Sequence, residues 1–313
     1  MDFLLNFAKN IIMRIAFIIT AHNDPVHLKR MTDALPESSE FFVHVDAKSD
    51  IEPFLKLIDN PRVHFTKKRI NVMWGSLGVV DSQMQAIGEA LVSGKEYDYF
   101  ISLSGLDYPL WSNRKIEEFL QSHKGTNFIY GVDMDKQGKE SKLYRQYRFF
   151  NCKYWRYKTL KSKFRVSLRE IVYALGIRKP LHFSAEGKNY NLYKGAMWWA
   201  FTQDFVKVAY NYWANNKEYY KYFINSFAPD ETFFSTIAFN NEELKRTTLG
   251  EVEHFTRLED VTPLTFIDYT NGIKILDESD LPRLLSSGKI FCRKTITGQS
   301  DRLMDKIDEL RKE

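Results

Sequence analysis

The stretches RIAFIITAHNDP (residues 14–25) and FFVHVDAKS (residues 41–49) decide the fold class. Each begins with a run of apolar, mostly β-branched or aromatic residues, which is typical of a buried strand, and ends in polar turn residues. Residues 26–34 between them carry a helical pattern. A strand, a helix and a strand in this order predict two parallel strands joined by a crossover helix.

The same alternation continues through the first half of the chain. Strands are predicted at residues 14–20, 41–45, 63–65, 99–103 and 127–130, and helices at 26–34, 51–58, 76–92 and 113–121, the last with Ser112 as its N-cap. This pattern predicts an α/β fold with a Rossmann-like, mostly parallel sheet and helices on both faces. Polar residues follow the strands at 21–24, 46–49 and 104–107, where such sheets bind ligands.

The second half is less regular. It has an apolar run at 196–201, helical patterns near 204–214 and 230–240, a strand pattern at 264–267 and a closing helix around 301–311. No repeat or low-complexity linker divides the chain. We therefore expect one catalytic unit over residues 14–308.

Composition excludes several classes of protein. The 313 residues are 44% hydrophobic, 27% charged and 15% aromatic, which excludes a disordered or collagen-like chain. Cys152 and Cys292 are too few for a disulfide framework and lack zinc-site spacing. The apolar stretch at 11–19 is too short to span a membrane, and residues 1–10 lack a signal-peptide cleavage site. A cytoplasmic, reducing location without export is expected.

Positive charge is concentrated between residues 136 and 180. This segment has fourteen Lys or Arg against two Glu, a net charge of +12, which leaves −7 for the rest of a chain whose total is +5. Aromatic residues are interleaved with these cations. Such a surface suits phosphates, an acidic glycan or an anionic membrane face, and an ordinary solvated basic helix is an equal alternative.

Several catalytic signatures are absent from the sequence. It has no P-loop, no Gly-x-Gly-x-x-Gly after the first strand, no His-Glu-x-x-His and no Gly-x-Ser-x-Gly. Asp133 and Asp135 have the Asp-x-Asp spacing with which carboxylates hold a divalent cation against a diphosphate. A solvated loop is the favoured interpretation of that pair, so no metal is expected.

Six blocks in a fixed order resemble the core-2/I-branching β-1,6-N-acetylglucosaminyltransferase and peptide xylosyltransferase family (glycosyltransferase family 14), in a bacterial-type form. They are FVHVDAKS (42–49), WGSLGVV (74–80), YFISLSGLDYP (99–109), GAMWWAFTQDFV (195–206), APDETFF (228–234) and FCRK (291–294). The resemblance spans about residues 14–308. It implies a glycosyltransferase A-type fold, with nucleotide bound by about 14–131, a basic aromatic insertion at about 136–180, and the catalytic and acceptor-binding part at about 181–308.

The resemblance also implies the chemistry, a metal-independent, inverting transfer from a UDP-sugar. Glu231 matches the family's catalytic base, and a carboxylate there can take the proton of the attacking hydroxyl. Lys294 matches the phosphate-binding lysine, and Arg293 beside it is a second candidate. The family's further diphosphate-binding arginine has no clear counterpart, Lys274 being the nearest cation. The structural alternatives are that Glu231 is an ordinary acidic residue in the first turn of a helix and that Arg293 and Lys294 are a basic pair on the surface.

Other site residues follow from strand ends and from aromatic character. Asp46, Asp107 and His22 are predicted to contact the donor, although an Asp in a turn and a His after a strand are often structural. Trp198 and Trp199 are predicted to line the acceptor side, because aromatic faces stack on sugar rings. If they alternate along a strand, only one of the two faces the cleft.

These inferences predict an enzyme that transfers N-acetylglucosamine, or as second choice xylose, to a glycan hydroxyl in the synthesis of a bacterial surface polysaccharide. The expected partners are a UDP-sugar, a free or carrier-linked glycan acceptor and the inner face of an anionic membrane. No cofactor, metal or nucleic acid is expected. The alternative is a non-enzymatic protein that binds an acidic polymer or nucleic acid through residues 136–180.

Overall fold

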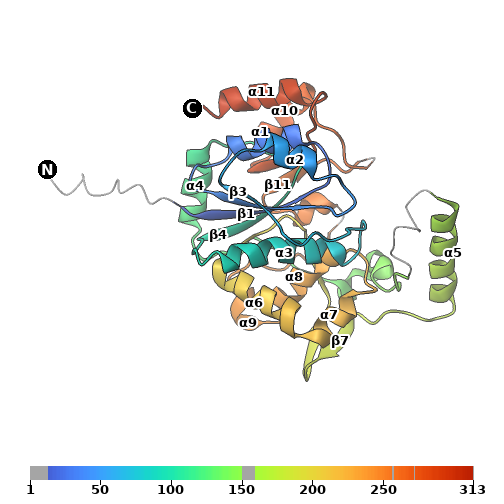
Figure 1. Ribbon diagram of the computed structural model, residues 1–313. Helices are drawn as coiled ribbons and strands as arrows, with labels where there is room; N and C mark the ends of the chain where they lie inside the picture. The colour runs from blue at the N-terminus through green and yellow to red at the C-terminus, as the bar shows by residue number, and fades with distance from the viewer. Residues whose placement is uncertain (1–12, 150–158, 256, 271, 313) are drawn as a thin grey trace.

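The computed structural model describes residues 13–149, 159–255, 257–270 and 272–312. A five-stranded sheet lies at its centre in the order β10-β4-β1-β2-β3 (Figure 1). Strands β1 (Ile15–Ala21), β2 (Glu40–Val45), β3 (Val63–Phe65) and β4 (Tyr99–Ser104) are parallel, and β10 (Ala200–Phe201) is antiparallel to β4. The predicted mostly parallel sheet is confirmed.

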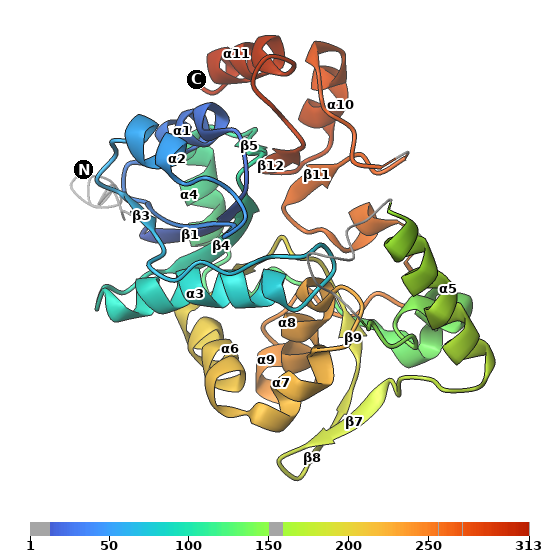
Figure 2. The same cartoon turned by 45° about the vertical axis from the view of Figure 1, so that its right-hand side comes forward.

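Both faces of this sheet are covered, because successive strand residues point to opposite sides. Ile15, Phe17 and Ile19 pack with α1 (Pro25–Ala34), α2 (Glu52–Leu57), α4 (Asn113–Ser122) and α11 (Asp301–Leu310). Ala16 and Ile18 pack on the other side with α3 (Gly78–Val92), α6 (Gln203–Asn215) and α8 (Pro229–Phe239) (Figure 2). The predicted arrangement of helices on both faces is therefore confirmed.

A second sheet extends the carboxyl end of β4. It contains β11 (Thr265–Ile267), β12 (Phe291–Arg293) and β5 (Asp107–Pro109), with β12 parallel to β11 and antiparallel to β5. The register pairs Arg293 with Asp107. A strand near the end of the chain is thus placed beside the carboxyl end of a central strand.

The remaining elements surround this framework. They are the paired strands β6 (Val132–Asp133) and β9 (Tyr193–Lys194), the hairpin β7 (His182–Ala185) and β8 (Lys188–Asn191), helices α5 (Leu160–Ala174), α7 (Lys217–Phe223), α9 (Glu242–Lys245) and α10 (Leu281–Ser286), and 3-10 segments at Met134–Leu143, Leu258–Val261 and Glu278–Asp280. The strand predicted at 127–130 is wrong, since Asn127 and Phe128 form only isolated bridges. Of the apolar run 196–201, only the last two residues form a strand.

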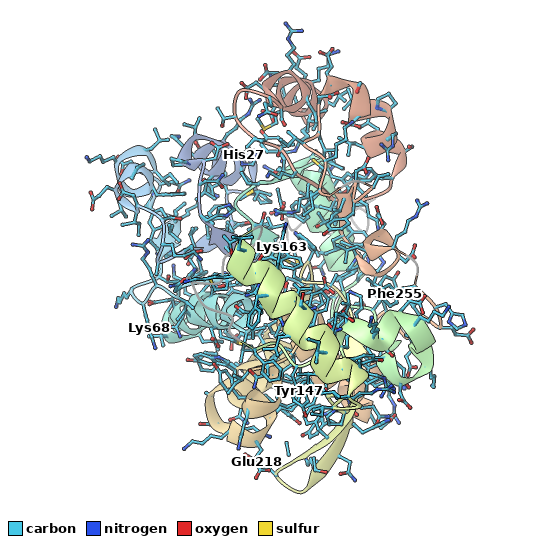
Figure 3. The ribbon with its side chains drawn as sticks, turned by 90° about the vertical axis from the view of Figure 1, so that its right-hand side faces the viewer. His27, Lys68, Tyr147, Lys163, Glu218 and Phe255 are labelled. Atoms are coloured by element: carbon cyan, nitrogen blue, oxygen red, sulfur yellow. The ribbon has the colours of Figure 1, made fainter. Side chains whose placement is uncertain are left out.

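Helix α5 belongs to the basic segment and lies at the edge of the molecule, facing the viewer with Lys163 in Figure 3. Residues 150–158 of the basic segment lie outside the described residues, and they include Cys152, Lys153, Arg156 and Lys158. Within the described ranges, no helix is both long enough and apolar enough to cross a membrane.

Candidate active site

A cavity of about 1110 Å³ lies at the carboxyl ends of β1, β2 and β4. His22 follows β1, Asp46 follows β2, and Ser104 ends β4, and all three line the cavity. The polar residues that follow these strands therefore line one cavity. The opposite wall comes from later segments, and it includes Tyr144, Lys194, Trp198, Phe227, Asp230, Glu231, Phe255, Arg257, Tyr269 and Arg293.

Glu231 lies in the first turn of α8 and is held by two side chains that the sequence analysis missed. Lys194 Nζ donates to Glu231 Oε2, and Tyr144 Oη donates to the same oxygen at 3.1 Å. The Lys194 side chain is only 5% exposed, against 22% for Glu231, so this ion pair is largely shielded from water. One carboxylate oxygen is thereby fixed by donors, while the residue remains in the cavity wall.

The backbone ties Glu231 to the same strand as Lys194. The amide N–H of Gly195, which follows β9, donates to the Glu231 carbonyl oxygen at 2.7 Å. A side chain at Gly195 would collide with the Tyr130 carbonyl oxygen, which lies 2.6 Å from an added Cβ. Lys194 directly precedes Gly195, the first residue of the block GAMWWAFTQDFV. Its position next to this block is the feature of the sequence that could have identified Lys194 as a site residue.

Asp230 is the neighbour of Glu231 and has a different environment. Its Oδ1 is buried, with no hydrogen-bond partner among the described residues. Burial, and after it the charge of Glu231, raise the pKa of the Asp230 carboxyl. The two adjacent residues of the cavity wall therefore differ in their contacts: Glu231 has an ammonium partner, whereas Asp230 Oδ1 has no hydrogen-bond partner among the described residues.

The Asp107 carboxylate contacts two side chains of the cavity wall, those of Arg293 and Trp198. Arg293 Nη1 lies 3.0 Å from Asp107 Oδ1, and Trp198 Nε1 donates to Asp107 Oδ2 at 2.9 Å. Ser104 also donates to Asp107 through its backbone N–H and its hydroxyl. Asp107 is 0% exposed and is not part of the cavity wall. This placement corrects the predicted donor contact of Asp107: its carboxylate positions Arg293 and Trp198.

The adjacent residues Trp198 and Trp199 point in different directions, as predicted for neighbours along a strand. Trp198 lines the cavity, whereas Trp199 is 0% exposed and stacks on Phe201 with ring centroids 4.2 Å apart. The prediction that Trp199 lines the acceptor side is wrong, because its ring belongs to the core. Trp74 also lines the cavity and is 77% exposed at its edge.

Asp46 organises the end of β2. Its Oδ2 lies 2.8 Å from Lys48 Nζ, and its Oδ1 accepts from the backbone N–H of Lys48 at 3.0 Å. Asp46 is 8% exposed and lines the cavity, as does Lys48. These contacts orient the aspartate at the position where a donor contact is predicted.

Two histidines at the strand ends, His22 and His44, have lowered pKa values. Burial, followed by the Arg293 charge, lowers the pKa of His22. Burial lowers the pKa of His44 to about 4, and the Ile70 backbone N–H donates to its Nε2 at 2.6 Å. His44 therefore carries its single proton on Nδ1. The positive charge at these strand ends comes from Lys and Arg side chains.

The remaining predicted residues lie outside the cavity wall. Lys294 is absent from the wall but close enough to His22 for its charge to lower the pKa of that histidine, and its own pKa is lowered by burial and then by Arg293. Lys274 Nζ is paired with Asp280 at 2.7 Å. That carboxylate neutralises Lys274, which weakens its candidacy as a diphosphate ligand.

Asp133 and Asp135 also lie outside the cavity wall. Lys136 Nζ is 3.3 Å from Asp133 Oδ2, and Arg145 Nη2 is 2.9 Å from Asp135 Oδ1. Among the described residues, no group of three or more His, Cys, Asp or Glu has an arrangement that could hold a metal ion. The Asp-x-Asp pair is thus engaged with protein cations outside the cavity wall.

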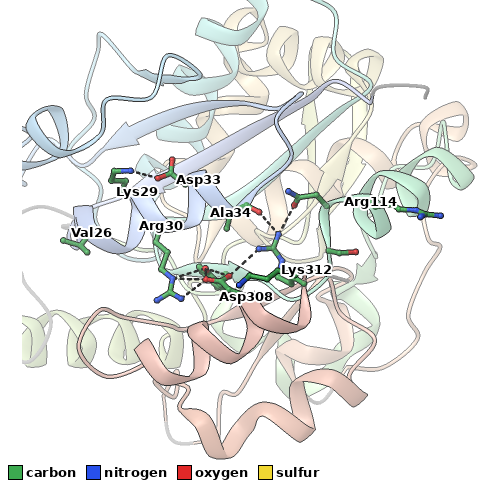
Figure 4. A pocket seen from close by; sticks show the side chains of 12 residues that line it. Val26, Lys29, Arg30, Asp33, Ala34, Arg114, Asp308 and Lys312 are labelled. Carbon is green, nitrogen blue, oxygen red and sulfur yellow. Dashed lines mark hydrogen bonds and ion pairs between the residues drawn. The ribbon is translucent and has the colours of Figure 1, made fainter. Parts of the chain in front are cut away.

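A second pocket of about 720 Å³ is lined by α1, the start of α4 and the end of α11 (Figure 4). Its arginines are already paired within the protein. Arg30 contacts Asp305 and Asp308, and Arg311 donates to the carbonyl oxygens of Trp111 and Ala34. These contacts join α11 to α1 and give the pocket a structural role.

Comparisons with known proteins identify the family of this chain. The family model described as Core-2/I-Branching enzyme matches residues 15–281. Xylosyltransferase 2 of Homo sapiens is 28% identical over 244 residues, which are 73% of this chain and 25% of that protein. Xylosyltransferase 1 of Rattus norvegicus is 26% identical over 73% of this chain and 26% of that protein.

This chain therefore spans about a quarter of the length of those curated relatives. The family match covers most of the chain, and the mixed α/β sheet is consistent with a glycosyltransferase A-type fold. The chain belongs to the Core-2/I-Branching enzyme family.

Proposed function

We propose that the protein is a glycosyltransferase, which moves a sugar from a UDP-sugar to a hydroxyl of a glycan acceptor, with inversion at the anomeric carbon and without a metal ion. The observation that carries the proposal is the position of Glu231, which lines the same cavity as Arg293 and the ends of β1, β2 and β4. A base and a cation at one cavity suit attack by an oxygen and departure of an anion.

The transfer is a single displacement. The acceptor hydroxyl oxygen forms the new bond to the anomeric carbon while the bond from that carbon to UDP breaks. The hydroxyl proton passes to Glu231, and the bonding electrons leave with the diphosphate. Lys194 and Tyr144 hold Oε2 of Glu231, which supports Oε1 as the oxygen that takes the proton.

Fixed cations stabilise the charge that develops on the diphosphate. Arg293 lines the cavity, and Lys294 follows it in the chain. Arg257 also lines the cavity and is exposed there, so it replaces Lys274 as the proposed further diphosphate ligand. Trp198 and Trp74 offer ring faces to a sugar.

The proposed donor sugar is N-acetylglucosamine, with xylose as the second choice. The relatives are named xylosyltransferases, which strengthens the case for xylose. We propose a free or carrier-linked glycan of a bacterial surface polysaccharide as acceptor and the cytoplasm as location. The two cysteines in 313 residues favour a reducing compartment. Membership in an enzyme family favours catalysis over the non-enzymatic binding of an acidic polymer or nucleic acid.

The test is Glu231→Gln, which removes the proton acceptor and keeps the size of the side chain. We expect transfer to fall by about 10²–10⁴-fold, with UDP affinity in calorimetry unchanged. Glu140→Gln is the matched control, because it neutralises another carboxylate of the same cavity that contacts neither Lys194 nor Tyr144 in the structure. Near-normal turnover in Glu231→Gln contradicts the assignment of the base.

A further inference from the structure

Helix α5 is oriented with its polar side toward the protein. Ser162 and Arg169 are only 5% and 4% exposed, and they lie two turns apart on one face. Arg169 Nη2 donates to the Phe149 carbonyl oxygen at 3.1 Å. The helix is therefore attached to the protein through polar contacts, the reverse of what an amphipathic surface helix usually does.

Large apolar side chains form the outward face. Leu160 is 83% exposed, Phe164 61%, Ile171 56% and Leu175 72%. Their spacing of four, seven and four residues places them in a stripe on one side of the helix, with Leu175 at its C-cap. Singly exposed apolar residues are ordinary, but a contiguous group of this kind marks an interaction surface.

The charges around this stripe have one sign. Lys161 and Lys163 are exposed on either side of it, and Arg178 is exposed beyond its end. Glu170, the single acidic residue of α5, is paired with Lys142 at 2.9 Å and accepts from Gln146. The surface offered to a partner is apolar and flanked by cations.

Other cations of the basic segment are used inside the protein. Arg145 is paired with Asp135, and the Arg148 guanidinium lies 4.1 Å from the centre of the Phe227 ring. Lys179 is 4% exposed and donates to the Tyr222 carbonyl oxygen. These residues pack the segment against the protein, whereas Lys161 and Lys163 point away from it.

We propose that the outward face of α5 docks on the surface of an anionic lipid bilayer. An apolar stripe with flanking lysines matches the acyl boundary and the negative headgroups of such a surface, and helices of this pattern lie in the plane of the interface. A second copy of the chain fits less well, because its own lysines would face these lysines across the contact.

Helix α5 is also tied to a stretch of chain that lines the cavity. Glu170 of α5 pairs with Lys142 and accepts from Gln146, and Glu140, Leu143 and Tyr144 of the same stretch line the cavity. A lipid-carried acceptor could then be reached without leaving the membrane surface. This consequence rests on the proposed function, while the docking itself does not.

The experiment is sedimentation of the full chain with vesicles of phosphatidylcholine alone and of phosphatidylcholine and phosphatidylglycerol in equal parts. We expect binding to the anionic vesicles and little to the neutral ones. The triple variant Leu160→Ser, Ile171→Ser, Leu175→Ser should lose binding by more than about tenfold, since each change removes apolar area from the contact. Val92→Ser, Leu285→Ser and Leu310→Ser, at exposed positions of other helices, is the matched control.

The charge is tested separately by Lys161→Gln with Lys163→Gln, which leaves the stripe intact. About fivefold weaker binding to anionic vesicles is expected per lysine, with UDP affinity and the melting temperature unchanged. Absence of wild-type binding, equal binding to both vesicle types, or full binding by the serine variant overturns the proposal. A dimer of the wild type that the serine variant lacks also overturns it, in favour of a second copy. None of these outcomes bears on Glu231, so failure of docking is distinguishable from failure of the proposed chemistry.

Discussion

Lys194 and Tyr144 orient the Glu231 carboxylate, because both donate to its Oε2. We predict that Lys194→Met lowers kcat/KM by about tenfold or more, because the carboxylate loses the ammonium group that fixes its position in a shielded site. Tyr144→Phe removes one hydrogen bond to the same oxygen and should lower kcat/KM by less. The measurements are kcat/KM and the melting temperature of each variant.

Lys142→Met is the control for this prediction. Lys142 pairs with Glu170 and is not part of the cavity wall, so its loss should leave kcat/KM unchanged. A loss of kcat/KM in Lys194→Met that is matched by a loss of melting temperature would mean that the lysine supports the fold and not the orientation of Glu231.

Asp230 should make the stability of the protein fall as pH rises. Its pKa is raised from the ordinary 3.8 by burial and by Glu231, so in the window above 3.8 the folded state keeps a proton that the unfolded chain releases. Stability declines with pH wherever the folded state binds more protons, and the decline ends above the folded-state pKa. Asp230→Asn cannot release a proton, so its melting temperature relative to wild type should increase from pH 4 to pH 8.

Asp204→Asn is the control for Asp230, because Asp204 also lies in the first turn of a helix but is exposed. Thermal melting at several pH values should show no comparable increase for that variant. A difference between Asp230→Asn and wild type that is flat or decreasing with pH would show that Asp230 ionises normally in the folded state.

For individual residues, the sequence predicts those whose position follows from the end of a strand or from a block of the family resemblance. His22, Asp46, Trp198, Glu231 and Arg293 were named on these grounds, and all five line the cavity. Their predicted roles stay predictions. Lys194 and Tyr144 are 37 and 87 residues from Glu231 in the chain, and their convergence depends on tertiary packing that one sequence does not show.

Among elements, the junction of β9 and α8 controls where the base lies. We predict that Gly195→Ala lowers stability by about 1–3 kcal/mol and reduces transfer, because the added methyl meets the Tyr130 carbonyl oxygen and pushes apart the contact between Gly195 and Glu231. Denaturant unfolding and kcat are the measurements. Gly88→Ala in α3 is the control, since its methyl meets only the Tyr210 side chain, at 3.0 Å; equal effects of the two changes would contradict a special role for this junction.

The central elements were predictable because their signals are local. Strand β3 has the predicted bounds, β2 and β4 are each one residue longer than predicted, and β1 is shifted by one residue. Residues 127–130 look like a strand, but Phe128 bridges only Ala200 and Asn127 only Thr248, so no ladder forms. The short strands β5 and β12 escaped prediction because three residues carry no periodicity, and their pairing decides the position of Arg293.

For the whole molecule, the distribution of charge around the cavity decides how a diphosphate is bound. Arg293 and Arg257 line it, Lys294 follows Arg293, and the Asp-x-Asp pair is held elsewhere by Lys136 and Arg145. We predict that transfer survives excess chelator and gains nothing from added manganese, because side-chain cations already face the leaving group.

The same distribution predicts which part of the donor each cation serves. Lys294→Ala and Arg257→Gln should weaken UDP binding in calorimetry while uridine binding stays nearly the same, since the lost contacts are to phosphate. Lys274→Ala is the matched control, because its ammonium group is paired with Asp280 at 2.7 Å and its loss should leave UDP affinity unchanged.

If chelation stops transfer and manganese restores it, the diphosphate depends on a metal. Asp133 and Asp135 would then have to leave their cation partners to bind it, and Asp133→Asn with Asp135→Asn should abolish the manganese response.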